Sequence, residues 1–296
     1  MTADGRAAGW LRLMPAVFVL IWSTGFIVAR YGMPYAPPLK FLVVRYALSL
    51  LCFGLWVAAT RVAWPVRRAQ WFHLAVTGIL MQAGYLGGVW AAVKAGMGSG
   101  LVALLVGIQP VLTAVWLSMN GGAITKRQWA GLLLGFAGLV LVVSRKLGQG
   151  GEVSVLTMGL AVFALLSITA GTLYQKRFVA PCDVRSASAV QLAAALVVTL
   201  PFALLETGAI VWNGAVIGSM AWAVLALSLG GASLLYMLIE RGTATAVTSL
   251  LYLVPPCTAV MAWLLFDEPI TLVTLAGISL TAVGVSLVVR SAAPPS

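Results

Sequence analysis

The sequence carries little charge for its length. Only 8% of its 296 residues are Asp, Glu, Lys or Arg, whereas a soluble domain of this size carries about 25%. Hydrophobic residues make up 61% of the chain, and the mean hydropathy is +1.04. A soluble fold cannot bury so much apolar surface, so we expect the chain to lie in a lipid bilayer.

Acidic residues are especially scarce. The seven are Asp4, Glu152, Asp183, Glu206, Glu240, Asp267 and Glu268. None falls in the middle of a hydrophobic span, and the sole histidine, His73, lies near the beginning of one. A proton-driven pump usually needs a titratable group inside the membrane. The sequence therefore favours transport down a substrate gradient. It also argues against an intramembrane enzyme, which would need paired acids or a nucleophile with a base.

Cysteine is rare as well. Cys52, Cys182 and Cys257 are odd in number and form no CxxC pair, so the sequence indicates neither a disulfide framework nor a zinc site. We expect no metal and no cofactor. The net charge of +11 comes from bases scattered singly or in pairs between apolar runs. This pattern indicates orientation in a membrane rather than binding to nucleic acid.

Long hydrophobic runs fill the rest of the chain. Each is close to the roughly 20 residues that cross a bilayer as a helix. They cover approximately residues 10–30, 38–59, 70–93, 97–119, 125–144, 155–175, 187–206, 216–239, 243–266 and 270–290. The sequence predicts an all-α membrane protein with ten transmembrane helices joined by short connections.

The two halves of the chain repeat one another. Residues 99–115 and 244–260, offset by 145, share 6 of 17 residues. Residues 124–143 and 270–289, offset by 146, share 9 of 20. We therefore predict two five-helix repeats, residues 1–147 and 148–296. Because five is odd, the second repeat must enter the membrane from the opposite side, which makes the repeats inverted.

The distribution of lysine and arginine predicts the orientation. With the N-terminus in the cytoplasm, 12 basic residues fall on the cytoplasmic side and 5 on the other side. This bias places both termini in the cytoplasm.

Proline interrupts the fourth and ninth spans at matching positions. Pro110 aligns with Pro255, which Pro256 follows directly. Each proline removes a backbone donor and clashes with the preceding helical turn. We interpret these positions as hinges beside a central cavity; a static kink is the alternative.

Polar and aromatic residues inside the spans are candidates for the wall of that cavity. The seven candidates for substrate binding are Trp22, Arg45, Gln82, Tyr85, Gln109, Ser167 and Tyr252. Gln82 and Tyr85 are three residues apart and so share a helix face. The alternative roles are anchoring at the membrane interface and hydrogen bonding between helices.

Arg45 is the one clear charge well inside a span. It lies about two helical turns after Pro38, or ~10 Å below the outer surface at roughly 1.5 Å per residue. A buried arginine is costly and is a functional candidate because it could hold a carboxylate. The alternative is that it extends toward the surface or bonds free carbonyls. Its position in the second repeat is taken by Val190 or Gln191, so its role is not symmetric.

Glycines recur on one side of the fifth span and of the tenth span. They are Gly131, Gly135, Gly138, Gly277 and Gly284. Small residues allow helices to approach closely. We expect these glycines to pack the two helices together, with a dimer seam as the alternative.

The run Leu20–Thr24, the position of Arg45 and the Pro-Thr pattern of the fourth and ninth spans resemble the drug/metabolite transporter superfamily. The chain is similar to its EamA-type exporters over essentially the whole length, and most of all to the YddG-type exporters. This resemblance implies export of aromatic and other neutral amino acids through the inner membrane, and a drug-like cation as a further substrate. The chain departs from that subgroup at Ser167, where an aromatic residue is expected. It also lacks the first-helix glutamate on which the four-helix multidrug members rely.

Together these features predict an inner-membrane carrier that exports amino acids and similar amphipathic metabolites by alternating access. The third, fourth, eighth and ninth helices would rock about the prolines. The partners expected are a small-molecule substrate and membrane lipid, with the protein a monomer. Drug or cation efflux, a nucleotide-sugar-type carrier and a structural membrane subunit are the alternatives.

Overall fold

The computed structural model describes residues 3–119, 125–146, 153–231, 234 and 253–292, and the regular structure in these ranges is helical throughout. The helices of the first half are α1 (Ala3–Gly32), α2 (Pro38–Thr60), α3 (Arg68–Gly78), the π-helix η1 (Ile79–Leu86), α4 (Gly87–Lys94), α5 (Ser99–Val106), α6 (Gln109–Met119) and α7 (Lys126–Lys146). Those of the second half are α8 (Val155–Phe178), α9 (Val184–Leu205), α10 (Gly214–Trp222), the π-helix η2 (Ala223–Gly231), α13 (Val254–Phe266) and α14 (Leu272–Ala292).

Several of these helices are suited to a bilayer by length and composition. Within the described ranges, six are long and apolar enough to cross one. They are Leu13–Gly32, Pro38–Thr60, Arg68–Lys94, Val155–Phe178, Val184–Leu205 and Gly214–Gly231. Shorter apolar helices cover the predicted fourth, fifth, ninth and tenth spans. The all-α membrane fold is therefore confirmed, while the ten transmembrane spans and the two inverted five-helix repeats remain predictions.

Local sequence explains where the helices begin and end. α2 starts at Pro38, where the missing N–H of proline is harmless because the first turn has no partner for it. α8 starts with a capping box, in which the Ser154 hydroxyl accepts from the Thr157 backbone and Thr157 bonds back. α9 and α10 have simpler caps, in which a side-chain oxygen of Asp183 accepts from the Arg185 N–H and that of Asn213 from the Val216 N–H.

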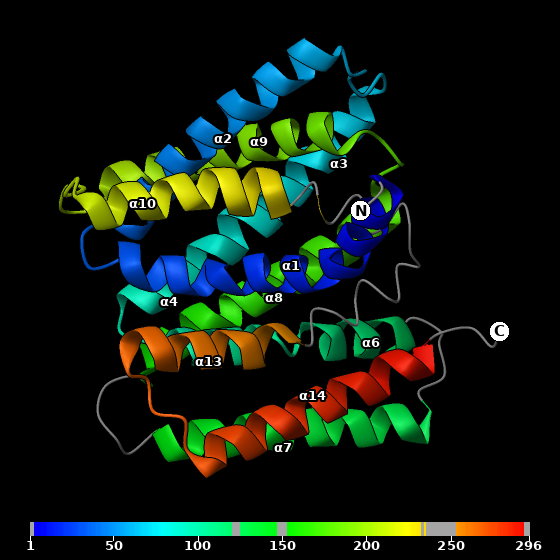
Figure 1. The fold of residues 1–296 in the computed structure, drawn as a ribbon, viewed down its shortest axis with the longest axis vertical. Helices are drawn as coiled ribbons and strands as arrows, with labels where there is room; N and C mark the ends of the chain where they lie inside the picture. The colour runs from blue at the N-terminus through cyan, green and yellow to red at the C-terminus, as the bar shows by residue number, and fades with distance from the viewer. Residues whose placement is uncertain (1–2, 120–124, 147–152, 232–233, 235–252, 293–296) are drawn as a thin grey trace.

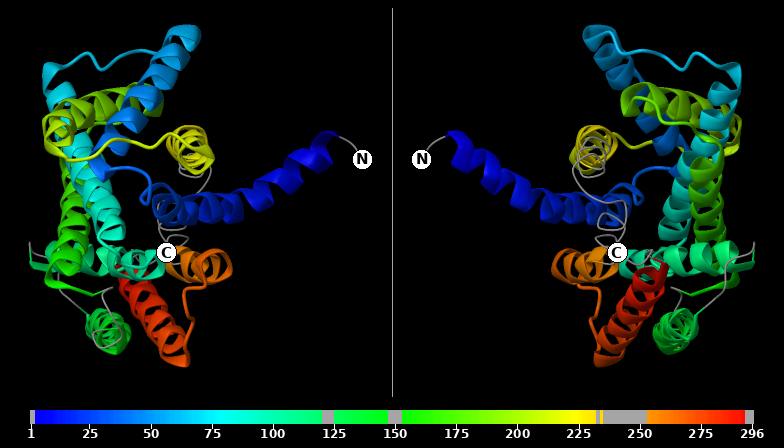
Figure 2. Two further views of the ribbon diagram at one scale, coloured as in Figure 1. Left: turned by 90° about the vertical axis from the view of Figure 1, so that its left-hand side faces the viewer. Right: turned by 90° about the vertical axis from the view of Figure 1, so that its right-hand side faces the viewer.

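The helices lie side by side in one bundle, with both described ends of the chain on the same side. In Figure 1, α1 begins and α14 ends toward the right, where α2 also ends and α3 begins. α2 and α9 pack together at one edge of the bundle, and α7 and α14 at the other (Figures 1 and 2). α1 contacts α13 and α10, while α8 contacts α5 and α3, so each half packs against the other.

The glycines of α7 and α14 lie where these two helices meet. A Cβ at Gly138 would collide with the backbone of Gly277, and one at Gly284 with the backbone of Gly131 and Gly135. The expectation that these glycines pack the two helices together is confirmed. Small residues allow this close approach, which supplies van der Waals contact where lipid offers no hydrophobic drive.

Two π-helices occupy corresponding places in the two halves. η1 lies inside the predicted third span, between α3 and α4, and η2 follows α10 in the predicted eighth span. A π-helix inserts an extra residue into the turn, and such turns are frequent at functional sites. Both π-helices contribute to the cavity described next.

Candidate substrate cavity

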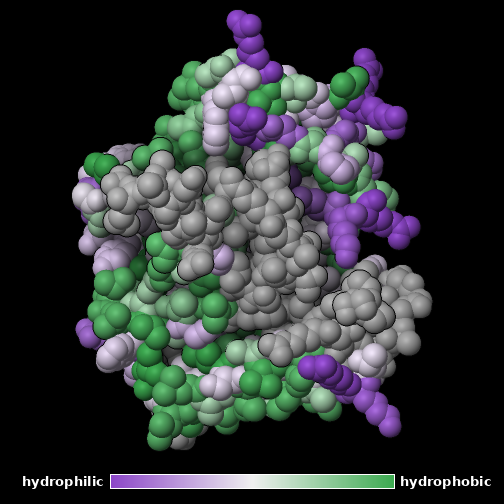
Figure 3. Space-filling model, turned by 45° about the vertical axis from the view of Figure 1, so that its right-hand side comes forward, coloured by the Kyte–Doolittle hydropathy of each residue, from purple (hydrophilic) through white to green (hydrophobic). Residues whose placement is uncertain are grey.

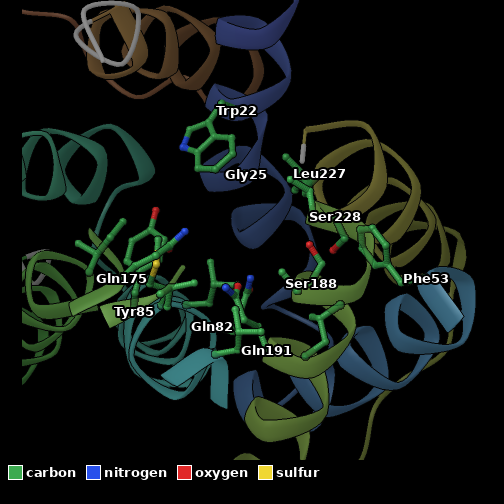
Figure 4. A pocket seen from close by; sticks show the side chains of 18 of the residues that line it. Trp22, Gly25, Phe53, Gln82, Tyr85, Gln175, Ser188, Gln191, Leu227 and Ser228 are labelled. Atoms are coloured by element: carbon green, nitrogen blue, oxygen red, sulfur yellow. The ribbon is translucent and has the colours of Figure 1, made fainter. Parts of the chain in front are cut away.

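A cavity of about 520 Å³ lies between the two halves of the bundle. Its wall comes from α1, α2, α3, η1, α4, α8, α9, η2 and the connection between α8 and α9. Figure 4 shows Trp22, Tyr85, Gln82, Gln191, Ser188 and Ser228 arranged around it. The volume suits a small metabolite rather than a macromolecule.

The cavity is buried at one end and exposed at the other. Arg45, Tyr85, Val89 and Trp90 form part of its buried wall. At the other end it is lined by residues 175–176 and 179–182, of which Gln175, Lys176, Ala180 and Pro181 are exposed. We call this exposed end the mouth. A solute can therefore reach the buried wall from the side of the bundle on which α8 ends and α9 begins.

Arg45 provides a buried positive charge in this cavity. It is 6% exposed, and its Nε and Nη2 atoms each lie 3.4 Å from the hydroxyl of Ser228. Its guanidinium carbon lies 5.9 Å from the centre of the Trp90 ring. No Asp or Glu is found among the described residues that line the cavity. The guanidinium thus retains N–H donors for a ligand in a site where anions are favoured and cations are repelled.

The π-helix η1 turns two polar side chains toward the cavity. Gln82 and Tyr85 both line it. The backbone carbonyl of Gln82 accepts a hydrogen bond of 2.7 Å from the hydroxyl of Tyr46. This bond satisfies a carbonyl in a stretch where helical bonding is irregular. In η2, the Ser228 hydroxyl likewise donates to the carbonyl of Ala223 at 3.0 Å.

Aromatic rings form much of the remaining wall. Trp22, Phe26, Phe53, Tyr85 and Trp90 belong to it. Trp22 also packs on Phe18 with ring centres 5.3 Å apart. Such rings offer large apolar area with few rotatable bonds, which suits the burial of a hydrophobic or aromatic side chain.

The structure brings four of the seven predicted binding residues together on the cavity wall: Trp22, Arg45, Gln82 and Tyr85. Gln109 is not on the wall, and its amide donates to the Thr172 hydroxyl at 2.8 Å. Ser167 is also absent from the wall, because it packs directly against Gly84. Tyr252 lies outside the described residues.

Several wall residues were missed by sequence reasoning. Gln191, Ser188 and Ser228 all face the cavity. Ser188 and Ser228 stand in apolar runs with no local pattern to mark them. Gln191 could have been found, because it is one of the two residues that align with Arg45 in the second repeat.

The candidate hinge prolines lie in the first turns of helices. Gln109 begins α6, so Pro110 is its second residue, and the turn Gly107–Ile108 separates α5 from α6. Val254 begins α13, and Pro255 and Pro256 follow. Both sites therefore mark the start of a helix, where proline is well tolerated. Their role as hinges remains a prediction.

The end of the bundle opposite the mouth is closed by bonds between segments. Glu206, just after α9, accepts from the backbone N–H groups of Leu39 and Lys40 at 3.1 and 2.9 Å. Glu268, just after α13, accepts from the backbone of Ser99 at 3.1 Å. Lys94 donates to the carbonyl of Met33 at 2.6 Å. We call this the closed end.

A helical membrane bundle with a cavity between its halves, which the described residues leave exposed at the mouth, has the architecture of a membrane carrier. The chain belongs to the EamA-like transporter family, whose model matches residues 10–144 and again residues 155–290. It is thus a multi-pass membrane transporter of the drug/metabolite transporter superfamily. The two matched segments fall one in each predicted repeat.

Relatives of this chain are transporters of distant sequence. The uncharacterized transporter YvbV of Bacillus subtilis is 28% identical over 281 residues, covering 93% of this chain and 90% of that protein. A probable amino-acid metabolite efflux pump of Salmonella typhimurium is 24% identical over 290 residues, covering 94% and 93%. A crystal structure with 19% identity superposes with a TM-score of 0.67 over 93% of this chain and 96% of that one, which shows the same fold.

Proposed function

We propose that this protein exports amino acids and similar small amphipathic metabolites from the cytoplasm across the inner membrane. The observation that carries the proposal is Arg45, a buried cation in a cavity whose described wall contains no acid. A buried charge without a counter-charge is costly. A substrate carboxylate would supply that counter-charge.

The chemistry of the wall suits the two ends of such a substrate. The guanidinium donates along parallel N–H bonds that match the two oxygens of a carboxylate. Trp22, Tyr85 and Trp90 would cover the apolar part of the side chain. The relative from Salmonella typhimurium, a probable amino-acid metabolite efflux pump, agrees with this substrate class.

The mouth is proposed to face the cytoplasm. α1 begins and α14 ends on this side (Figure 1). Hydrophilic side chains also gather toward the right and top of the face in Figure 3, whereas its lower left is largely hydrophobic. Arg61, Arg67, Arg68 and Arg177 belong to the helix ends on the mouth side. An excess of arginine and lysine is typical of cytoplasmic segments.

Transport would then proceed by alternating access, as follows. Substrate enters through the mouth, Arg45 binds its carboxylate, the mouth closes, and the closed end opens. The breaks that precede α6 and α13 are the proposed hinges. The described wall contains no carboxylate and no histidine that could carry a proton, which supports movement down the substrate gradient.

A second candidate is a phosphate-bearing metabolite of the nucleotide-sugar type. Arg45 would also bind a phosphate, and Lys176 lines the mouth. An organic cation is disfavoured because it would share the cavity with Arg45. A substrate panel containing amino acids, nucleotide sugars and quaternary amines separates the three.

Counterflow in proteoliposomes tests the proposal. Arg45→Gln is expected to lower amino-acid flux about 10- to 100-fold, because hydrogen bonds to charged groups contribute roughly 1.5–3 kcal/mol. Arg45→Lys keeps the charge but loses the paired donors, so it should retain intermediate flux. Size-exclusion elution and thermal unfolding of each variant in detergent establish that it is folded.

Unchanged amino-acid flux in a folded Arg45→Gln protein would contradict the proposed site. Unchanged flux in both Trp22→Ala and Tyr85→Ala would show that the aromatic wall does not contribute to substrate binding. Substrate movement that reverses when only a proton gradient is imposed would replace the facilitative mechanism by proton coupling.

A further inference from the structure

Four polar residues of the cavity form two pairs that correspond between the halves. α2 begins at Pro38 and α9 at Val184, an offset of 146. Val44 and Ala47 of α2 then match Val190 and Ala193 of α9. By the same offset, Arg45 of the first half corresponds in sequence to Gln191 of the second half. In the π-helices, Gln82 corresponds to Ser228 and Gly84 to Gly230.

The first pair, Arg45 and Ser228, joins α2 to η2 through the hydrogen bonds already described. The second pair, Gln191 and Gln82, consists of one residue of α9 and one of η1. Gly78, one turn before Gln82, packs directly on the backbone of Gln191, so these two helices touch at this level. Figure 4 shows the Gln82 and Gln191 side chains next to each other on the cavity wall. We call Gln82 and Gln191 the amide pair.

The amide pair has unused hydrogen-bonding capacity. Within the described part of the chain, neither side-chain amide has a hydrogen-bond partner within reach, although both residues are partly buried. Each amide carries one acceptor oxygen and two N–H donors. Polar groups left unpaired once the cavity closes would cost about 1–3 kcal/mol each. A substrate that occupies the closed cavity must therefore satisfy them or the closed state is penalised.

The geometry points to the amide pair as the second recognition site of the cavity, taking an uncharged side-chain group that both donates and accepts hydrogen bonds. Hydroxyl and carboxamide groups have this chemistry. The inference rests on the proposed function, in which Arg45 holds the carboxylate, and it names the substrate class as amino acids with neutral polar side chains. The pair is neutral, so it offers no counter-charge to a lysine or glutamate side chain.

The two corresponding positions have thus diverged in charge. A carrier with arginine at both would bind dicarboxylates, and one with glutamine at both would have no fixed anion site. Arginine at one and glutamine at the other gives the substrate one orientation, with its carboxylate at α2 and η2 and its side chain at α9 and η1.

Threonine and valine provide the test, because they have nearly the same shape and differ by a hydroxyl in place of a methyl. In proteoliposome counterflow, the wild-type protein is expected to prefer threonine over valine about 10-fold in kcat/KM, as one satisfied hydrogen bond predicts. Gln191→Leu and Gln82→Leu should each reduce this preference to about twofold or less. Threonine flux should fall more than valine flux in both variants.

Thr199→Val is the matched control on α9. It removes a polar group two turns beyond Gln191. The Thr199 hydroxyl is buried, has no hydrogen-bond partner among the described residues, and does not line the cavity. It should leave the preference for threonine unchanged.

The outcomes separate this inference from the proposed function. Equal transport of threonine and valine by the wild type, or an equal loss of both in folded glutamine variants, would overturn the amide pair as a recognition site and leave amino-acid export standing. Transport of neither amino acid by folded wild-type protein would overturn both. Loss of the preference in the glutamine variants alone supports the inference.

Discussion

The closed end and the mouth are held by different kinds of bond. At the closed end, two carboxylates accept from backbone N–H groups in the first turns of α2 and α5. At the mouth, Gln70 donates to the carbonyl of Ala180 at 3.0 Å and Arg185 to the hydroxyl of Thr60 at 3.1 Å, both at exposed positions.

This difference determines which end of the cavity opens more easily. A carboxylate at a helix N-terminus gains from the helix dipole as well as from the hydrogen bond. Exposed bonds between neutral or hydrated groups contribute little because water replaces them readily. The closed end is therefore stabilised by charge, whereas the mouth is held by weaker, exposed bonds. Glu206 and Glu268 both belong to the second half of the chain and both bind helices of the first half, so opening this end separates the halves.

The largest effect expected concerns the side from which the cavity can be reached. In a Cys52→Ser/Cys257→Ser background, a membrane-impermeant maleimide should modify Cys182 about 100-fold faster from the cytoplasmic side than from the other side. This factor corresponds to a population of roughly 1% for the conformation in which the cavity opens to the non-cytoplasmic side. Cys182→Ser provides the unlabelled control. Equal rates from both sides would contradict the inequality of the two ends.

The same reaction has a defined pH dependence. Burial raises the pKa of the Cys182 thiol, a hydrogen bond from Gln70 partly opposes the shift, and the Asp183 carboxylate adds to it. The thiolate is the reactive form, so labelling should accelerate about tenfold per pH unit near neutrality.

An intermediate effect is expected from neutralising the closed end. Glu206→Gln or Glu268→Gln keeps an acceptor oxygen but removes the charge, at a cost of about 1–2 kcal/mol. The population opened at this end should rise about 5- to 30-fold. A Ser188→Cys reporter in the cavity, in a protein without the native cysteines, should then be labelled faster from the non-cytoplasmic side by the same factor.

The matched change at the mouth is Asp183→Asn. If it accelerates labelling of the Ser188→Cys reporter from the non-cytoplasmic side as much as the glutamate variants do, the comparison of the two ends fails.

The smallest effect is expected from Asp183→Asn itself. Asparagine still caps α9, so flux should change less than about twofold. Hydrogen bonds from Arg185 lower the pKa of Asp183 below its ordinary value of 3.8. The carboxylate is then ionised at all pH values above about 4, and its contribution to stability is lost only as the pH falls through the lowered pKa. Thermal unfolding of the wild type and of Asp183→Asn should show the same pH dependence between about pH 5 and 8; a difference there would contradict this assignment.

The sequence predicted the parts of this molecule that depend on composition and spacing. Hydrophobic runs mark the spans because lipid tolerates little else. Gly138 and Gly277 marked the packing of α7 on α14 because glycine alone allows that approach. Arg45 could be identified because burying a charge inside an apolar run is costly on any face of the helix.

Residues whose role depends on the helix face were harder to predict. Gln109 has the same chemistry as Gln82, yet it bonds Thr172 while Gln82 lines the cavity. Sequence spacing assumes 3.6 residues per turn, and the π-helices η1 and η2 break that period. Ser228 could not be assigned to the wall without knowing that η2 turns it toward Arg45.

The charge of Arg45 also has an electrical consequence. It belongs to the carrier and returns with it, so the net charge moved in each cycle is that of the substrate alone. A zwitterionic amino acid would leave without current and reach equal concentrations on both sides. A metabolite with a carboxylate and no amino group would carry one negative charge outward. An inside-negative potential favours that movement by about 2.3 kcal/mol per 100 mV, or roughly 50-fold in concentration. For a carrier of this kind, the membrane voltage would lower the cytoplasmic concentration of such acids below the outside concentration, whereas zwitterionic amino acids would only reach equal concentrations on both sides.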